Sequence, residues 1–369
     1  MIDKTLISTR HKGLAKAKKS KADEFYTQYI DIEKEINAYL EYNPDVFKGK
    51  TLLLPCDDPE WSNFTKYFAQ NFERFGLKKL ISTSFAQESK GIEDQNQPTL
   101  FEVNDPKFDE DKTNIKGKIF KLDHDTSGDG KIDINDLEWE YLESDGDFNS
   151  SEVKKLRDES DIIITNPPFS LFRDFVQWIM SSEKQFLIIG NINAITYKEV
   201  FPLIKDNRIW LGTGMGRWIS GFIVPDSYDL YGTEARIDND GNRIIATNNC
   251  LWLTNIDHGK RHQPLPLMTM QDNIRYSSHK DVKGKEFKKY DNYDAIEVPY
   301  TDSIPSDYDG VMGVPITFLD KYNPEQFEII GASDNGAIDN EYKISHFKKH
   351  NEPYLDGKKR YKRIFIKRR

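Results

Sequence analysis

The feature that most constrains the fold is a regular alternation of short apolar runs with amphipathic helical patterns. The apolar runs have the length of buried strands, and helical patterns follow three of the four. The strand candidates lie at 51–54, 77–85, 162–165 and 186–189, and the helical patterns lie at 61–75, from about 170 and at 197–204. Because crossover helices join parallel strands, this alternation predicts an α/β fold with a mostly parallel, doubly wound sheet, whose ligands bind beyond the carboxyl ends of its strands.

Local signals refine this plan. A further helix is predicted over about 23–40, where apolar residues recur at helical spacing. Asp58-Pro59-Glu60 supplies an N-cap, a proline and a first-turn acid for the helix at 61–75, and Gly76 can end it. Residues 87–147 are polar and acidic and interrupt the alternation, which indicates an insertion.

The chain changes character after Asp206. Shorter strand-like runs are separated there by Gly, Asn and Asp, and Asp240-Gly241 is a hairpin signal. The main sheet is therefore expected to end in a β-hairpin near 235–256. Beyond His258 the chain is irregular and rich in Lys, Tyr, Pro and Asp, which predicts a mixed part of strands and irregular segments.

Composition excludes several protein classes. Charged residues make up 31 % of the chain, apolar residues 37 % and aromatic residues 12 %, which suits a globular core rather than general disorder. Cys56 and Cys250 are too few for a disulfide framework or a cysteine zinc site, and they fit a reducing compartment. The sequence shows neither a signal peptide nor a membrane span, so the expected location is the cytoplasm.

Charge is distributed unevenly. The net charge is −9, whereas the first 21 residues carry +6 and the last 23 carry +8, which leaves −23 for the residues between them. Basic ends on an acidic body suit a polyanionic partner, although solubilising termini explain the charge equally well. The candidate phosphate contacts lie in three basic segments, 258–263, 279–290 and 358–369, and include Lys260, Arg261, Lys358, Lys359 and Arg360.

The segment Asn166-Pro167-Pro168-Phe169 directly follows an apolar strand candidate. The prolines fix the local φ angles and donate no N–H, so nearby carbonyl oxygens can face a ligand without competing donors. The Asn166 amide oxygen and the Pro167 carbonyl can both accept hydrogen bonds from one exocyclic amino group, and Phe169 can stack on a planar base. This arrangement suits alkylation of an aromatic amine, through fixed dipoles that draw its nitrogen toward tetrahedral geometry.

From Asp23 to Ile256 the sequence resembles the EcoRI-type adenine-specific DNA methyltransferases. The resemblance is strongest in LLLPCDDPEWSNFTKYF, SDGDFNS, DIIITNPPFSLFRDF and FLIIGNINAITYKEVFPLIK. It implies a Rossmann-like class I methyltransferase fold and methyl transfer from S-adenosylmethionine to N6 of an adenine rotated out of double-stranded DNA. It also implies a restriction-modification or orphan methylation role, and the former would involve a cognate restriction endonuclease.

The resemblance carries site roles over by position. It implies a catalytic role for Asn166, Pro167, Pro168 and Phe169, and cofactor contacts for Phe25, Tyr26, Thr27, Pro55, Cys56, Asp57, Asp58, Asp147 and Phe148. Two features that are common among methyltransferases are missing, because no glycine-rich turn follows the strand at 51–54 and no acid stands near 82–84. Asp58 is equally suited to capping a helix, and Tyr26 and Asp147 also fit a packed aromatic and a solvated turn.

A second motif lies within the insertion. The segment DTSGDGKIDIND fits the spacing of an EF-hand loop, with Asp instead of Glu at its last ligand position. It predicts a structural Ca²⁺ site formed by Asp125, Ser127, Asp129 and Asp136, and an ordered acidic loop without an ion is the alternative. The flanking segments predict a strand over GKIFKL and a helix over DLEWEYL.

Together these features predict three parts: a flexible basic segment at 1–22, a methyltransferase domain at 23–257, and a DNA-gripping region at 258–369. Methylation of an RNA base or a protein glutamine is the alternative activity, because Asn-Pro-Pro-aromatic turns serve those reactions as well. An alternative of another class is a calcium-dependent binding module with an inactive methyltransferase domain.

Overall fold

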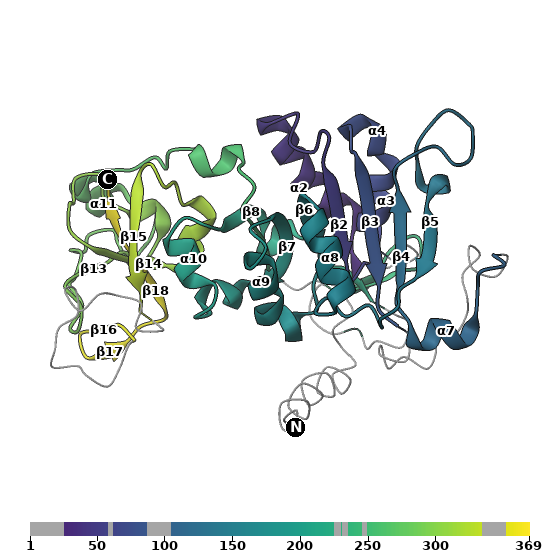
Figure 1. Cartoon of the computed structure of the whole chain (residues 1–369). Coiled ribbons are helices and arrows are strands. Elements are labelled where there is room, and N and C mark those ends of the chain that lie inside the picture. The colour runs from purple at the N-terminus through teal and green to yellow at the C-terminus, as the bar shows by residue number, and fades with distance from the viewer. Residues whose placement is uncertain are drawn as a thin grey trace, which may run out of the picture. The chain divides into compact units, whose positions relative to one another are not determined.

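The computed structural model describes residues 26–57, 62–86, 105–224, 230, 235–245, 249–333 and 352–369. These residues form two compact units, coloured along the chain in Figure 1. The first unit contains the described residues up to Ile192 together with Gly214–Ile256, and the second contains Asn193–Thr213 and Asp257–Arg369. No helix among the described residues is long and apolar enough to cross a membrane.

A large sheet forms the centre of the first unit. Within this unit its strand order is β5-β4-β3-β2-β6-β7-β12, and the four strands β3, β2, β6 and β7 run parallel. The strands are β2 (Thr51–Pro55), β3 (Lys79–Ser84), β4 (Lys118–Leu122), β5 (Glu138–Tyr141), β6 (Ile162–Thr165), β7 (Gln185–Asn191) and β12 (Cys250–Thr254). Strand β8 (Trp210–Met215) begins in the second unit and ends in the first. This mixed sheet with a parallel centre confirms the predicted fold class in its main feature.

The insertion extends this sheet. Strands β4 and β5 add to β3 in antiparallel order, so the predicted strand over GKIFKL is confirmed and the predicted helix over DLEWEYL is wrong. In β5, Trp139 is buried whereas Glu138 and Glu140 are exposed, which is the alternation of a strand with one covered face. Four residues are too few for this alternation to be distinguished from a helix in the sequence.

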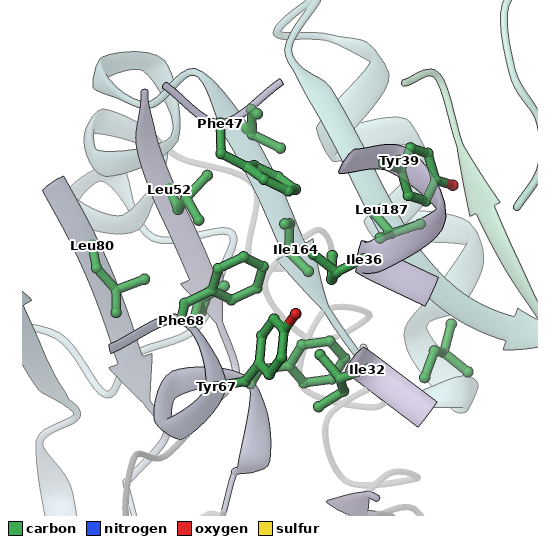
Figure 2. Close-up of a cluster of buried hydrophobic side chains, with 14 of the residues drawn as sticks. Ile32, Ile36, Tyr39, Phe47, Leu52, Tyr67, Phe68, Leu80, Ile164 and Leu187 are labelled. Carbon is green, nitrogen blue, oxygen red and sulfur yellow. The ribbon is translucent and has the colours of Figure 1, made fainter. Parts of the chain in front are cut away.

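Helices cover the sheet on both faces. On one face, α2 (Tyr29–Tyr42) and α3 (Asn63–Gln70) pack side chains such as Ile36 and Phe68 against Leu52, Ile164 and Leu187, as Figure 2 shows. The intervening strand residues are also buried and point to the opposite face, where α8 (Ser151–Glu159) contacts β2. The remaining helices of this unit are α4 (Phe72–Phe75), α7 (Glu110–Ile115) and α9 (Phe172–Met180).

Two predicted helix starts are shifted. The first helix begins at Tyr29 rather than near 23, because Tyr26–Thr27 form the short strand β1. In the described residues α3 begins after Ser62, whose hydroxyl accepts a hydrogen bond from the Phe64 N–H at 3.1 Å. The predicted cap Asp58 lies outside the described residues, and Gly76, at φ +62°, ends α4 as predicted.

A second, smaller sheet of this unit has the order β1-β9-β11-β10. The predicted hairpin is confirmed in β10 (Arg236–Ile237) and β11 (Arg243–Ile245), but it belongs to this small sheet together with β9 (Phe222–Val224). Only β12 joins the large sheet, antiparallel to β7. The expectation that the hairpin ends the main sheet is therefore wrong, because the chain changes sheets between β11 and β12.

The second unit is built around a sheet of order β13-β14-β18-β15. Strand β18 lies between two partners, and its residues Ile364, Phe365 and Ile366 are fully buried. The bounds are β13 (Ile296–Glu297), β14 (Met312–Pro315), β15 (Phe327–Ala332), β16 (Tyr354–Leu355), β17 (Lys358–Lys359), β18 (Arg363–Arg368), α10 (Phe201–Lys205) and α11 (Met270–Tyr276). The basic end of the chain is therefore partly a core strand.

Short 3-10 helices connect several of these elements. They are η1 (Ile134–Asp136), η2 (Phe169–Leu171), η3 (Ile192–Thr196), η4 (Gly216–Trp218), η5 (Gly259–His262), η6 (Thr301–Ser303) and η7 (Ile316–Lys321).

Candidate active site

Two of the predicted site segments meet at the carboxyl ends of neighbouring parallel strands. Strands β2 and β6 are paired through Leu52 with Ile162 and Leu53 with Ile163. At their carboxyl ends the Thr165 hydroxyl donates a hydrogen bond of 2.6 Å to the Pro55 carbonyl. The Asn166-Pro167-Pro168-Phe169 turn therefore starts beside the loop that carries Cys56 and Asp57, which is the edge where doubly wound sheets bind ligands.

The turn after β6 holds its aromatic residue at the surface of the core. Pro167 is buried, Asn166, Pro168 and Phe169 are half-buried, and Phe169 opens the short helix η2. The Phe169 ring meets Phe222 of β9 edge to face, with the ring centres 6.5 Å apart. One side of this ring is thus supported by the core, as a platform for a planar ligand requires.

The loop after β2 replaces the missing glycine with a strained cysteine. Cys56 has φ +68°, a left-handed conformation that glycine adopts readily and other residues seldom do. Asp57 is buried, its carboxylate accepts a hydrogen bond of 2.8 Å from the Ser62 hydroxyl, and its carbonyl accepts one from the Ser82 hydroxyl. These contacts hold the left-handed turn between the end of β2 and the start of α3.

Sequence reasoning missed the supporting residues Ser62, Ser82 and Thr165. Thr65 continues the network, because its hydroxyl donates to that of Ser82 at 3.0 Å. A hydroxyl at the last position of an apolar strand candidate, as at Thr165, is the signal that could have identified one of them. The partners of these hydroxyls lie on other elements, so the sequence alone could not supply them.

The segment predicted to contact the methionine part of the cofactor lies close to this loop. Strand β1 pairs with β9 through Tyr26 with Ile223 and Thr27 with Phe222. The Asn63 side chain at the start of α3 donates a hydrogen bond of 2.9 Å to the Thr27 carbonyl. Tyr26 and Thr27 are therefore brought to the helix that follows Asp57, whereas Phe25 and Asp58 lie outside the described residues.

Asp147 and Phe148 lie in a loop beside the end of β3. The Asp145 carbonyl accepts a hydrogen bond of 2.9 Å from the Ala86 N–H, and a Cβ on Gly146 would collide with the Ser84 carbonyl. The Asp147 carboxylate accepts the Asn149 N–H at 2.8 Å. The buried Phe148 ring packs against Phe175 and Trp178 of α9, with ring centres 5.1 and 5.7 Å away. These contacts of Phe148 are made within the hydrophobic core.

The EF-hand-like loop satisfies its carboxylates with its own backbone. Asp136 accepts hydrogen bonds from the N–H groups of Thr126, Ser127 and Asp133, and Asp125 accepts from those of Gly128 and Gly130. These bonds lower the pKa of both carboxyl groups. Within the described part of the chain no group of three or more His, Cys, Asp or Glu residues could hold a metal ion, so the predicted calcium site at Asp125, Ser127, Asp129 and Asp136 gains no support.

Two of the residues predicted to bind DNA make contacts inside the second unit. Lys260 donates a hydrogen bond to the Thr213 carbonyl at 2.9 Å and pairs with Asp320 at 2.5 Å. The Arg261 guanidinium is buried, lies 3.6 Å from the centre of the Trp210 ring and donates to Asn207. These contacts show structural roles for both side chains.

The three other predicted DNA contacts are exposed. Lys358 and Lys359 form β17, and Arg360 follows it. Lys359 pairs with Glu352 at 2.7 Å. These side chains present positive charge to solvent, as a phosphate contact requires.

Comparison with known proteins identifies the family of the chain. Residues 13–369 match the family described as adenine-specific methyltransferase EcoRI. The chain is 50 % identical to type II methyltransferase M.EcoRI of Escherichia coli over 320 residues, which is 87 % of this chain and 89 % of that protein. It is 34 % identical to type II methyltransferase M.MpnI of Mycoplasma pneumoniae over 360 residues, which is 96 % of this chain and 97 % of that protein.

A third relative, type II methyltransferase M.MgeORF184P of Mycoplasma genitalium, is 33 % identical over 362 residues, 96 % of this chain and 98 % of that protein. No solved structure matches the chain significantly. The family match covers the large sheet, the turn after β6 and the second unit alike. The chain therefore belongs to the EcoRI family of adenine-specific methyltransferases.

Proposed function

We propose that this chain is a site-specific DNA methyltransferase that transfers a methyl group from S-adenosylmethionine to N6 of adenine in double-stranded DNA. The observation that carries the proposal is the turn Asn166–Phe169 at the carboxyl end of β6, tied by Thr165 to the loop after β2. In a member of this family, that juxtaposition puts an amine-binding turn next to the usual cofactor edge.

The proposed chemistry follows from the turn. The Asn166 amide oxygen and the Pro167 carbonyl accept the two N–H bonds of the adenine amino group, which draws the nitrogen toward tetrahedral geometry and exposes its lone pair. Phe169 stacks on the adenine, which has to leave the duplex to reach these acceptors. The exposed lone pair would then accept the methyl group that S-adenosylmethionine supplies when bound, and the amino group would release a proton to solvent.

The residues present fit S-adenosylmethionine. The left-handed turn at Cys56 allows close approach to the loop after β2, although no glycine is present there. In our proposal Pro55, Cys56 and Asp57 line the cofactor, Tyr26 and Thr27 hold its methionine part, and Asp147 accepts a hydrogen bond from its adenine. When bound, this group supplies an electrophilic methyl on sulfur, so the protein needs neither a nucleophile nor a metal of its own.

The proposal also covers the contacts with DNA and the biological role. Lys358, Lys359 and Arg360 contact DNA phosphates, and the second unit takes part in recognising the sequence around the target adenine. Type II methyltransferases such as M.EcoRI are among the relatives of this chain, which supports a restriction-modification role. We place that role in the cytoplasm, together with a cognate endonuclease.

A transfer assay with labelled cofactor tests this function. The purified chain is incubated with S-adenosylmethionine carrying a tritiated methyl group and with duplex DNA, RNA or a bacterial protein extract, and DNA digests are separated for N6-methyladenine. Label in N6-methyladenine of duplex DNA is the expected result. Label in RNA or in protein glutamine instead would overturn the proposal in favour of those substrates, and a folded protein that binds no cofactor would overturn the methyltransferase activity.

A further inference from the structure

An exposed tryptophan is presented by a loop of the first unit. Trp218, at the end of η4, is 73 % exposed, whereas Trp139, Trp178 and Trp252 of the same unit are buried. The loop comprises residues 216–221 and connects β8, which ends at Met215, with β9. A large indole in water leaves much apolar surface unburied, and such side chains are enriched where they bind partners.

Two buried carboxylates of α2 hold this loop. Glu35 accepts a hydrogen bond of 2.8 Å from the Gly214 N–H, and Asp31 accepts bonds of 2.8 Å from both the N–H and the hydroxyl of Ser220. Asp31 and Glu35 are each only 2 % exposed, and burial raises the pKa of Asp31 while the bonds from Ser220 oppose that rise. Burial of two carboxylates is costly, and here they satisfy donors on both sides of Trp218, at the end of β8 and at Ser220 of the loop.

The loop ends are fixed by further contacts. Gln28 donates hydrogen bonds to the Ser220 hydroxyl at 2.7 Å and to the Gly221 carbonyl at 3.0 Å. Gly221 has φ +122°, and a Cβ there would lie 2.7 Å from the Ile245 carbonyl oxygen. These contacts fix the backbone that presents Trp218 before any partner arrives, which lowers the entropic cost of binding.

The loop leads directly into the candidate active site. Phe222, four residues after Trp218, touches the Phe169 ring and pairs with Thr27. Four residues span at most about 14 Å, so the Trp218 backbone lies within that distance of the Phe222 backbone, and the Phe222 ring is in turn the neighbour of Phe169. Phe169 is half-buried against the core, which suits contact with a base taken out of the duplex. Trp218 faces solvent, which suits contact with the duplex itself.

We infer that Trp218 stacks on the bases beside the position that the target adenine leaves, and so stabilises the open duplex while the adenine occupies the turn at Asn166–Phe169. This inference rests on the proposed function. Aromatic and apolar side chains stack on bases and wedge between base steps in other DNA-binding proteins. The roles then divide: Phe169 holds the flipped base, and Trp218 occupies the space behind it.

The test uses duplexes of the methylated sequence, once it is identified, with 2-aminopurine in place of the target adenine. The fluorescence of 2-aminopurine rises when the base leaves the stack. Trp218→Ala is compared with Trp218→Phe and with Ile237→Ala, a matched loss of an exposed apolar side chain, 60 % exposed, in the same unit. Single-turnover methylation of ordinary duplex and of duplex with a mismatch opposite the adenine is measured in parallel.

We expect Trp218→Ala to reduce base extrusion and the methylation rate about 5- to 150-fold, the range that loss of base–aromatic stacking gives. Trp218→Phe should retain most of the activity, Ile237→Ala all of it, and the mismatch should rescue Trp218→Ala because its adenine is already unpaired. Cofactor affinity and melting temperature should not change.

Three outcomes would overturn this role. They are wild-type behaviour of Trp218→Ala, a defect that the mismatch does not rescue, and a weakened cofactor affinity that accounts for the loss. Wild-type protein that methylates no DNA would instead overturn the proposed function itself, and this inference with it.

Discussion

The turn after β6 and the basic strand β18 are both conspicuous in the sequence, but the structure gives them very different surroundings. Asn166–Phe169 stands at the carboxyl edge of the parallel strands, where the alternation of strands and helices predicts a ligand. The segment 363–368, expected to be part of a DNA-gripping tail, is instead an inner strand with fully buried Ile364, Phe365 and Ile366.

The difference shows that a motif at a defined position in the fold predicts a functional site better than a cluster of basic residues does. Arg363 is mostly buried and pairs with Glu297 at 2.5 Å, and the Arg369 guanidinium donates a hydrogen bond of 3.3 Å to the Phe327 carbonyl. The same Glu297 carboxylate accepts a hydrogen bond from the buried Tyr290 hydroxyl, and burial raises the pKa of that tyrosine. Basic residues that count toward a surface charge in the sequence thus hold the second unit together.

Removal of β18 should have the largest effect. A chain that ends at Lys362 loses an inner strand and three fully buried apolar side chains, each worth about 2–5 kcal/mol on truncation. We expect the second unit to lose its cooperative unfolding transition and to become sensitive to protease. Calorimetry and limited proteolysis would check this, and a truncated chain with unchanged melting and protease resistance would contradict the inner position of the strand.

Asn166→Ala should have the next largest effect, and on activity alone. Loss of one fixed acceptor for the amino group should reduce the methylation rate about 10²- to 10³-fold, by analogy with removal of one oxyanion-hole donor. Cofactor affinity, measured by calorimetric titration, should be nearly unchanged because the cofactor contacts come from other segments. A variant with full activity would refute the role of Asn166.

The free energy of unfolding should depend on pH because His258 of the second unit is buried. Burial lowers its pKa to about 4, its ring bonds the Leu211 carbonyl at 2.9 Å, and the free side chain has a pKa near 6.5. The unfolded state therefore binds more protons between pH 6.5 and 4, so stability is full above pH 6.5 and falls by up to about 3 kcal/mol as the pH drops to 4.

His258→Gln should flatten this part of the stability curve. Urea unfolding at pH 7, 6, 5 and 4 would compare the two proteins. Parallel curves for the wild type and the variant would contradict a depressed pKa at His258.

Neutralising the exposed basic residues should have the smallest effect on folding. Lys358→Gln with Arg360→Gln should change stability by less than about 0.5 kcal/mol, because both side chains are exposed. If they neutralise phosphates as proposed, the slope of log affinity against log salt should fall by about 0.9 for each contact. An unchanged slope in a DNA-binding titration would assign them to solubility.

Much of the first unit could be predicted from the sequence. The parallel strands are apolar runs of strand length between amphipathic helices, and that local pattern also placed Asn166–Phe169 at a strand end. The small sheet could not be predicted in this way, since Thr27 pairs with Phe222 nearly two hundred positions away. Register between such distant short strands depends on packing rather than on local pattern.

The candidate site, too, could be predicted only in part. The segments that carry it lie where strands end, so their placement follows from the order of strands and helices. The left-handed Cys56 could not be predicted, because its backbone depends on bonds from Ser62 and Ser82 to Asp57. Likewise, Arg261 could not be assigned to the interior, because its partners Trp210 and Asn207 lie about fifty residues earlier.

Single-molecule sequencing of DNA from a methylation-free host would show which adenines this chain methylates. One culture expresses the wild-type chain and the other Asn166→Ala, at matched protein levels. We expect N6-methyladenine at one recurrent sequence in the wild-type culture and little or none with the variant. Unmodified adenine in the presence of folded wild-type protein, or equal modification in both cultures, would contradict this expectation.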